Sequence, residues 1–261
     1  MITSIQNPRV KAARKLVDRK ERYATGMLLA EGVRIIDDAV QCGVQPIVVF
    51  YDPIAAETNP AAAALLATME ASGTDCQPCT PEVFATLTST VTPQGVVAVL
   101  PLPLNRPLPA PLTFALVLDA VRDPGNAGTL LRSAAAAGVQ AVIFGPQTVD
   151  PFNDKVLRSG MGAHFRVPLR ICPTWEQVRQ ILGPRPDLFL AEAGAQLAYD
   201  QVDWRVPCAL IVGGEASGAG APARAEATAI AIPMHSHVES LNAAVAGSII
   251  LFEAARQRRG G

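Results

Sequence analysis

The sequence predicts an α/β protein of two domains, the second a mostly parallel sheet covered by helices on both faces. Short apolar runs of strand length alternate with segments of helical spacing along most of the 261 residues, an order typical of α/β folds. One stretch, residues 101–111, interrupts this order with five prolines in eleven positions, and proline is excluded from helix interiors and central strands. We therefore place a linker there and expect domains over residues 1–105 and 106–261.

The composition favours a globular protein without a membrane segment. Hydrophobic residues make up 49% of the chain and charged residues 17%, so a sizeable core can form. No apolar stretch approaches the roughly 20 residues that span a bilayer, and the N-terminus lacks the apolar run of a signal peptide. We expect a cytoplasmic protein that has no contact with a membrane.

Metal ligands are sparse. Cys76 and Cys79 form a C-x-x-C pattern, which fits a redox pair or half of a zinc site, but no second pair at suitable spacing completes such a site. His235 and His237 are separated by one residue, and no acidic or cysteine partner accompanies them. We expect buried thiols and no bound metal.

The first domain is expected to be a small α/β unit with a basic N-terminal helix. Residues 1–22 contain seven lysines or arginines and two acidic residues, an excess that suits contacts with phosphates. A solvated helix face would carry the same pattern. The predicted helices cover residues 8–21, 31–41, 60–71 and 81–87, and the predicted strands cover residues 27–30, 47–51, 74–77 and 95–100.

The second domain shows longer alternation. Predicted strands cover residues 114–118, 141–144, 188–191, 209–212 and 229–232, and predicted helices cover residues 126–137, 154–161, 175–182 and 240–256. Along the last helix, apolar residues recur at helical spacing, namely Leu241, Val245, Ile249 and Phe252.

The first of three unusual loops joins a strand to a helix at residues 123–132. A glycine-rich turn at a helix N-terminus exposes backbone donors to an anion. Arg132 follows Asn126 by six residues, and its planar guanidinium suits a phosphate or a carboxylate. A tight turn followed by a surface arginine explains this segment equally well.

The other two loops follow later strands. Residues 213–220 hold four glycines, which allow the backbone to approach a ligand closely, and Glu215 among them can accept hydrogen bonds. Residues 232–242 lead into the last helix, where Ser240 is a candidate cap and Asn242 is expected within the first turn.

Taken together, the three loops resemble the three motifs of the SpoU/TrmH family of RNA ribose 2′-O-methyltransferases, in the SPOUT superfamily. The matches are Asn-x-Gly-x-x-x-Arg at 126–132, Gly-x-Glu-x-x-Gly at 213–218, and Ile-Pro-Met with Ser-Leu-Asn at 232–234 and 240–242. Residues 157–165 resemble the segment that links these motifs, and residues 1–105 resemble the family's substrate-binding domain. Three residues depart from the family pattern: Ala219, His235 and His237.

The resemblance implies a deep trefoil knot in the C-terminal domain, S-adenosylmethionine (AdoMet) as cofactor, and a homodimer to which the final helix contributes. It implies a cofactor pocket that includes Gly213, Gly214, Gly218, Ile232 and Leu241. It also implies a catalytic set centred on Arg132, in which Asn126, Glu215, Ser240 and Asn242 arrange the nucleotide. The family's arginine is assigned as a general base, but a guanidinium is normally protonated, so orientation of the substrate is an equally open role.

Two other classes of protein fit parts of this pattern. A catalytically silent RNA-binding protein on the same scaffold would not need the catalytic set that the resemblance implies. An NAD-dependent enzyme is disfavoured because the first loop lacks the G-x-G-x-x-G spacing and a suitable acidic partner. The N-terminal domain favours ribosomal RNA over transfer RNA as the substrate, with a tRNA 2′-O-methyltransferase as the alternative.

Overall fold

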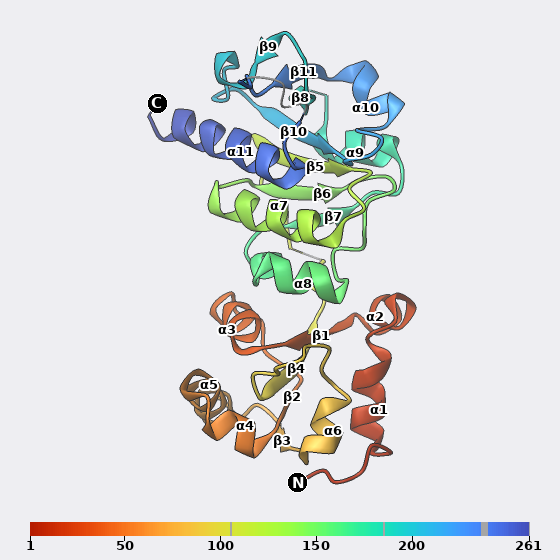
Figure 1. Ribbon diagram of the computed structural model, residues 1–261, viewed down its shortest axis with the longest axis vertical. Coiled ribbons are helices and arrows are strands. Elements are labelled where there is room, and N and C mark those ends of the chain that lie inside the picture. The colour runs from red at the N-terminus through yellow and green to blue at the C-terminus, as the bar shows by residue number, and fades with distance from the viewer. Residues whose placement is uncertain (105, 185, 236–239, 261) are drawn as a thin grey trace. The chain divides into compact units, whose positions relative to one another are not determined.

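The computed structural model describes residues 1–104, 106–184, 186–235 and 240–260, and the chain divides into two compact units. Unit 1 comprises Met1–Leu102 and Phe152–Phe165, and unit 2 comprises Pro103–Pro151 and Arg166–Gly261. The α/β class predicted from the sequence is confirmed (Figure 1). The segment around predicted helix 154–161 groups with unit 1, although it follows the proline-rich stretch in the chain.

Unit 1 is built on a mixed four-stranded sheet in the order β1-β4-β2-β3. β4 pairs antiparallel with β1 and β2, and β3 adds to β2 in parallel. One face buries an apolar cluster that includes Val10, Phe50, Phe84 and Val97. The strands are β1 (Met27–Glu31), β2 (Val48–Tyr51), β3 (Cys76–Pro78) and β4 (Val96–Pro101).

The basic N-terminal segment forms two helices, α1 (Pro8–Lys15) and α2 (Arg19–Thr25), so the prediction of one continuous helix was wrong. The Asp18 side chain accepts a hydrogen bond from the Lys20 amide at 2.8 Å and caps the second helix. The buried Arg22 donates to the carbonyl oxygens of Leu16 and Val17 at 3.0 and 2.7 Å. These bonds satisfy two carbonyl oxygens between α1 and α2 that have no partner within a helix.

Further helices in unit 1 lie close to their predicted positions, except for a short one that begins at Pro53 and was missed. They are α3 (Val33–Gln41), α4 (Pro53–Glu57), α5 (Pro60–Ala71), α6 (Pro81–Ala85), α8 (Asp154–Gly160) and the 3-10 turn η1 (Ala163–Phe165).

Unit 2 is built on a seven-stranded sheet in the order β7-β6-β5-β10-β8-β11-β9. All its pairings are parallel, which confirms the parallel sheet predicted for this domain. Two short strands, β7 and β9, were not predicted. The strands are β5 (Phe114–Asp119), β6 (Ala141–Phe144), β7 (Leu169–Ile171), β8 (Asp187–Ala191), β9 (Leu197–Ala198), β10 (Cys208–Gly213) and β11 (Thr228–Ala231).

Helices cover both faces of this sheet. α9 and α10 pack on the face that carries Val117 and Ile211. α7 and α11 lie side by side on the opposite face (Figure 1), where Gly247 faces Leu130 and Val212. A Cβ atom on Gly247 would lie 2.5 Å from Leu130 Cδ2, so a larger residue here would require the Leu130 side chain to move. The helices are α7 (Pro124–Ala136), α9 (Trp175–Leu182), α10 (Ala221–Glu226), α11 (Ala243–Arg259) and the 3-10 turn η2 (Tyr199–Gln201).

The last helix buries a different face from the one that its apolar repeat suggested. Its buried residues are Ala244, Gly247, Ile250, Leu251, Ala254 and Ala255. The apolar repeat noted in the sequence is instead exposed: Leu241 by 37%, Val245 by 48%, Ile249 by 37% and Phe252 by 45%. An exposed apolar stripe of this kind is typical of an interaction surface. Within the residues described here, no helix has the length and apolar character to cross a membrane.

Candidate functional site

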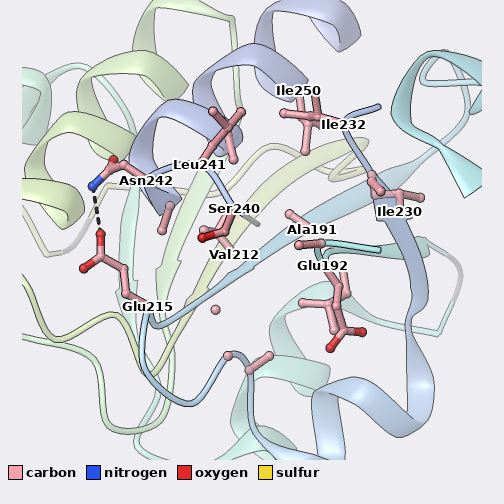
Figure 2. A pocket seen from close by; sticks show the side chains of 18 of the residues that line it. Ala191, Glu192, Val212, Glu215, Ile230, Ile232, Ser240, Leu241, Asn242 and Ile250 are labelled. Carbon is pink, nitrogen blue, oxygen red and sulfur yellow. Dashed lines mark hydrogen bonds between the residues drawn. The ribbon is translucent and has the colours of Figure 1, made fainter. Parts of the chain in front are cut away.

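A cavity of about 440 Å³ lies at the carboxyl ends of β8, β10 and β11 (Figure 2). Parallel α/β sheets bind ligands at these strand ends, and the volume falls in the range of small-molecule sites. The cavity is lined in part by the five residues expected to hold the cofactor, which are Gly213, Gly214, Gly218, Ile232 and Leu241.

The glycine loop that forms one wall is folded back on itself. Gly214 and Gly218 exchange two backbone hydrogen bonds at 2.8 and 3.2 Å. A Cβ atom on Gly213 would lie 2.3 Å from the Ala219 nitrogen, and one on Gly214 would lie 2.2 Å from the Ala120 oxygen. The glycines are therefore required sterically, and they leave a wall of backbone groups that a flat polar ligand can approach.

A polar cluster joins the three unusual loops, which are far apart in the chain. Glu215 Oε1 accepts hydrogen bonds from Asn126 Nδ2 at 2.7 Å and from Asn242 Nδ2 at 2.8 Å. Asn242 Nδ2 also donates to Asn126 Oδ1 at 3.0 Å. Figure 2 shows the bond between Asn242 and Glu215 at one side of the cavity. We call these three residues the Asn-Glu-Asn cluster.

Asn242, and not Ser240, caps the last helix. Asn242 Oδ1 accepts from the amides of Ala244 and Val245 at 3.0 and 3.2 Å, so the expectations that Ser240 caps the helix and that Asn242 lies within its first turn were both wrong. Ser240 is exposed and lines the cavity instead. Because the cap uses only the amide oxygen, the Asn242 nitrogen stays available for Glu215.

Arg132 lies apart from the cluster. It is exposed on α7 and does not line the cavity. A separation of six residues places it about 240° around the helix from Asn126. Across the described ranges its side chain makes no hydrogen bond or ion pair within the chain. One copy of the chain therefore brings together the Asn-Glu-Asn cluster and Ser240 but leaves Arg132 outside.

Three charged residues near the cavity were missed in the sequence. Arg224 lines the cavity, forms an ion pair with Glu192 at 3.4 Å and donates to the Ser217 carbonyl oxygen at 3.2 Å. Asp119 is buried at the end of β5 and accepts a hydrogen bond from the Gly220 amide at 2.7 Å. Burial raises the pKa of the Asp119 carboxyl, and the bond from Gly220 opposes that shift. The signal in the sequence was an acidic residue placed directly after an apolar strand run.

No group of three or more metal-ligating side chains forms in the part of the chain that the structure describes. Cys76 and Cys79 are both free thiols. His235 is exposed, and His237 lies outside the described residues.

Comparisons with protein families match both parts of the chain. Residues 113–252 match the SpoU rRNA Methylase family, and residues 7–98 match the MRM3-like substrate binding domain. The first match contains all three loops described above.

Relatives along the whole chain bear similar names. The 23S rRNA (guanosine(2553)-2′-O)-methyltransferase RlmP of Bacillus subtilis is 34% identical, over 96% of this chain and 97% of its own length. The human mitochondrial rRNA methyltransferase 3 is 31% identical, over 93% of this chain and 70% of its own length.

Solved structures show the same fold. The AdoMet-bound rRNA methyltransferase from Sinorhizobium meliloti has a TM-score of 0.82 and 31% identity, covering 98% of this chain and 97% of its own. The SpoU methyltransferase AviRb from Streptomyces viridochromogenes, in complex with AdoMet, has a TM-score of 0.82 and 29% identity, covering 98% of this chain and 100% of its own. On the matching family models, sequence relatives and fold, the chain belongs to the SpoU rRNA methylase family.

Proposed function

We propose that the protein transfers a methyl group from AdoMet to a ribose 2′-hydroxyl of ribosomal RNA. The observation that carries this proposal is the meeting of three distant loops, in which the Asn-Glu-Asn cluster borders a cavity walled by glycine backbone. Relatives named as 23S rRNA 2′-O-methyltransferases and family structures solved with AdoMet support the same activity.

The cavity fits AdoMet in size and chemistry. Its side-chain-free wall at Gly213 and Gly214 suits close contact with a flat base, and Ile232 and Leu241 add apolar surface. When bound, AdoMet supplies an electrophilic methyl group on a sulfonium. The protein then has to hold the ribose oxygen in line with that methyl group and let its proton leave.

The members of the Asn-Glu-Asn cluster hold one another in place. Glu215 is fixed by two amide donors, Asn126 and Asn242, so its carboxylate does not have to reorganise when the nucleotide arrives. Both asparagines also belong to helix starts, Asn126 in the first turn of α7 and Asn242 as the cap of α11. We assign the cluster and Ser240 to orienting the nucleotide and the reacting hydroxyl.

We further propose that the protein is a homodimer and that Arg132 of each subunit acts in the site of the other subunit. The exposed apolar stripe on α11, formed by Val245, Ile249 and Phe252, offers a surface for a second copy. Arg132 is exposed on α7, the helix that packs beside α11. Pairing through these helices would let Arg132 of one subunit complete the site of the other subunit. Its guanidinium suits a phosphate next to the reacting ribose.

Residues 1–105 are proposed as the domain that selects RNA. Arg14 and Lys15 on α1, and Arg19 and Lys20 on α2, are exposed cations. Reversing the charges of Arg14 and Lys15 should lower the slope of log affinity against log salt by about 1.4 to 1.8, because two phosphate contacts are lost. An unchanged slope would show that α1 is only a solvated helix face.

Two further features are proposed on family membership. The parallel sheet of unit 2 is expected to carry the trefoil knot of its relatives, residues 106–261 forming the AdoMet-binding domain. We also propose the cytoplasm as the place where the protein acts.

The activity is tested with purified protein, AdoMet labelled in its methyl group, and deproteinised ribosomal or transfer RNA. Incorporation into ribosomal RNA supports the proposal, and incorporation into transfer RNA alone supports the tRNA alternative. AdoMet and RNA binding without incorporation would indicate the silent RNA-binding protein.

A further inference from the structure

Asp119 connects both ends of the glycine loop to the centre of the sheet. Its backbone oxygen accepts from the Gly214 amide at 3.1 Å, and its side-chain Oδ2 accepts from the Gly220 amide at 2.7 Å. Asp119 is only 3% exposed, and it lies opposite Gly213 in the pairing of β5 with β10. One residue at the end of β5 therefore holds the loop where it starts and where it ends.

The loop between these two anchors is the wall of the cofactor cavity. Gly213, Gly214, Glu215, Gly218 and Ala219 all line the cavity, whereas Asp119 does not. The loop is closed by the backbone bonds between Gly214 and Gly218 at 2.8 and 3.2 Å. With its shape fixed internally, its place in the molecule depends on what holds its two ends.

The glycine loop packs closely against Asp119 and its neighbour Ala120. Ala120, the next residue, has a positive φ of 60°, and its oxygen would lie 2.2 Å from a Cβ atom on Gly214. A Cβ atom on Gly220 would lie 3.3 Å from Asp119 Oδ2. The carboxylate and the loop end therefore fit each other with little free space.

We infer that Asp119 is a positioning residue for AdoMet: it sets the glycine loop in place through its side-chain bond to Gly220 without touching the cofactor. If the Asp119 carboxylate is removed, the Gly220 amide loses its hydrogen-bond acceptor. The end of the loop is then released while the rest of the sheet keeps its pairing. This inference rests on the proposed function, because it assumes that the cavity binds AdoMet.

The test compares Asp119→Ala with Asp119→Asn, which keeps an acceptor of the same length. AdoMet affinity is measured by calorimetry and thermal unfolding is recorded for each protein. The exposed Asp200 on η2 gives a matched control, Asp200→Ala. We expect Asp119→Ala to weaken AdoMet binding by about tenfold or more, as the loss of a hydrogen bond to a charged group predicts. Asp119→Asn should stay within about threefold of wild type, and the Asp200 control should not change.

Steady-state kinetics separate positioning from a general loss of structure. A folded Asp119→Ala protein should show a raised KM for AdoMet and an unchanged KM for RNA. Equal AdoMet affinity in folded Asp119→Ala and wild type would overturn the inference, and so would an asparagine variant as weak as the alanine variant. If the alanine variant does not fold, Asp119→Ser, which is too short to reach the Gly220 amide, gives the same comparison.

The outcomes for the inference and for the proposed function are distinct. Wild-type protein that binds no AdoMet would overturn both. Wild-type protein that binds AdoMet but methylates no RNA would overturn the proposed activity alone, with the inference then decided by the binding constants.

Discussion

Asn242 has two roles that use different atoms of one amide group, and substitutions can separate them. Its oxygen caps α11 through the amides of Ala244 and Val245, and its nitrogen donates to Glu215 and Asn126. Asn242→Asp keeps the capping oxygen and loses the donor. Asn242→Ala loses both.

The structure gives a magnitude for each role. Loss of an asparagine cap costs about 1 kcal/mol, which lowers the Tm of a chain of this size by about 3 °C. Loss of the two side-chain hydrogen bonds, at about 1 kcal/mol each, lowers the Tm by about a further 6 °C. The same free energy, when it is lost from the orientation of the site, lowers kcat/KM by about thirtyfold. In Asn242→Asp, repulsion between the new carboxylate and Glu215 adds to that loss. Asn242→Ser caps the helix without a charge and isolates the missing donor.

The assay pairs thermal unfolding with methyl transfer to ribosomal RNA. We expect Asn242→Asp and Asn242→Ser to lose activity and to unfold below wild type, and Asn242→Ala, which also loses the cap, to unfold about 3 °C below Asn242→Ser. Near-normal turnover by Asn242→Ser would refute the assignment of the amide nitrogen to the site. Equal Tm values for Asn242→Ala and Asn242→Ser would refute the capping role.

Three further predictions test other parts of the account. Arg132→Ala and Arg132→Lys should both lose methyl transfer, because lysine lacks the planar two-pronged geometry of the guanidinium. Tm and AdoMet binding should stay unchanged, because the side chain is exposed on α7. Normal turnover by the lysine variant would contradict the orienting role. Phe252→Asp should convert the proposed dimer to a monomer in analytical ultracentrifugation, because Phe252 is 45% exposed in the apolar stripe; a dimer that persists in this variant would place the interface elsewhere. Burial raises the pKa of the Asp119 carboxyl in the folded chain above its ordinary value of 3.8, so folded protein binds the proton more tightly than unfolded protein does. Wild type should therefore lose stability relative to Asp119→Asn as pH rises through the folded pKa, and parallel Tm curves across that range would contradict it.

Local patterns in the sequence were sufficient for most of the fold. The apolar run at 114–118 and the helix signals after Asn126 predicted β5 and α7 to within a few residues, because each depends on neighbouring residues. The break between α1 and α2 was missed because the residues around Asp18 favour a helix by composition. The Asp18 side chain instead bonds to the backbone and starts a new helix.

The outward face of α11 could not be read from periodicity. A repeat at Val245, Ile249 and Phe252 normally predicts the buried face of a helix. Here α11 buries the face that carries Gly247, which lies against Leu130 and Val212, and Val245, Ile249 and Phe252 lie on the exposed side. Which face is buried depended on the neighbouring helix, which the sequence pattern does not specify.

The candidate site was predicted as three loops, but its geometry was not. Glycine content and the family resemblance selected the loops around Asn126, Glu215 and Asn242. Their convergence depends on the strand order β5-β10-β8-β11 and on the packing of α11 against α7, which are long-range features. Asp119 was missed because its role exists only through the Gly220 amide, 101 residues away in the chain.

The central claim is that the methyl group reaches a ribose oxygen and not a base. The direct measurement is mass spectrometry of nucleosides from ribosomal RNA methylated by the purified protein with labelled AdoMet. The account predicts that the label appears in a 2′-O-methylated nucleoside with wild type and disappears with Arg132→Ala. Label on a base, or equal labelling of the ribose by the Arg132→Ala protein, would contradict it.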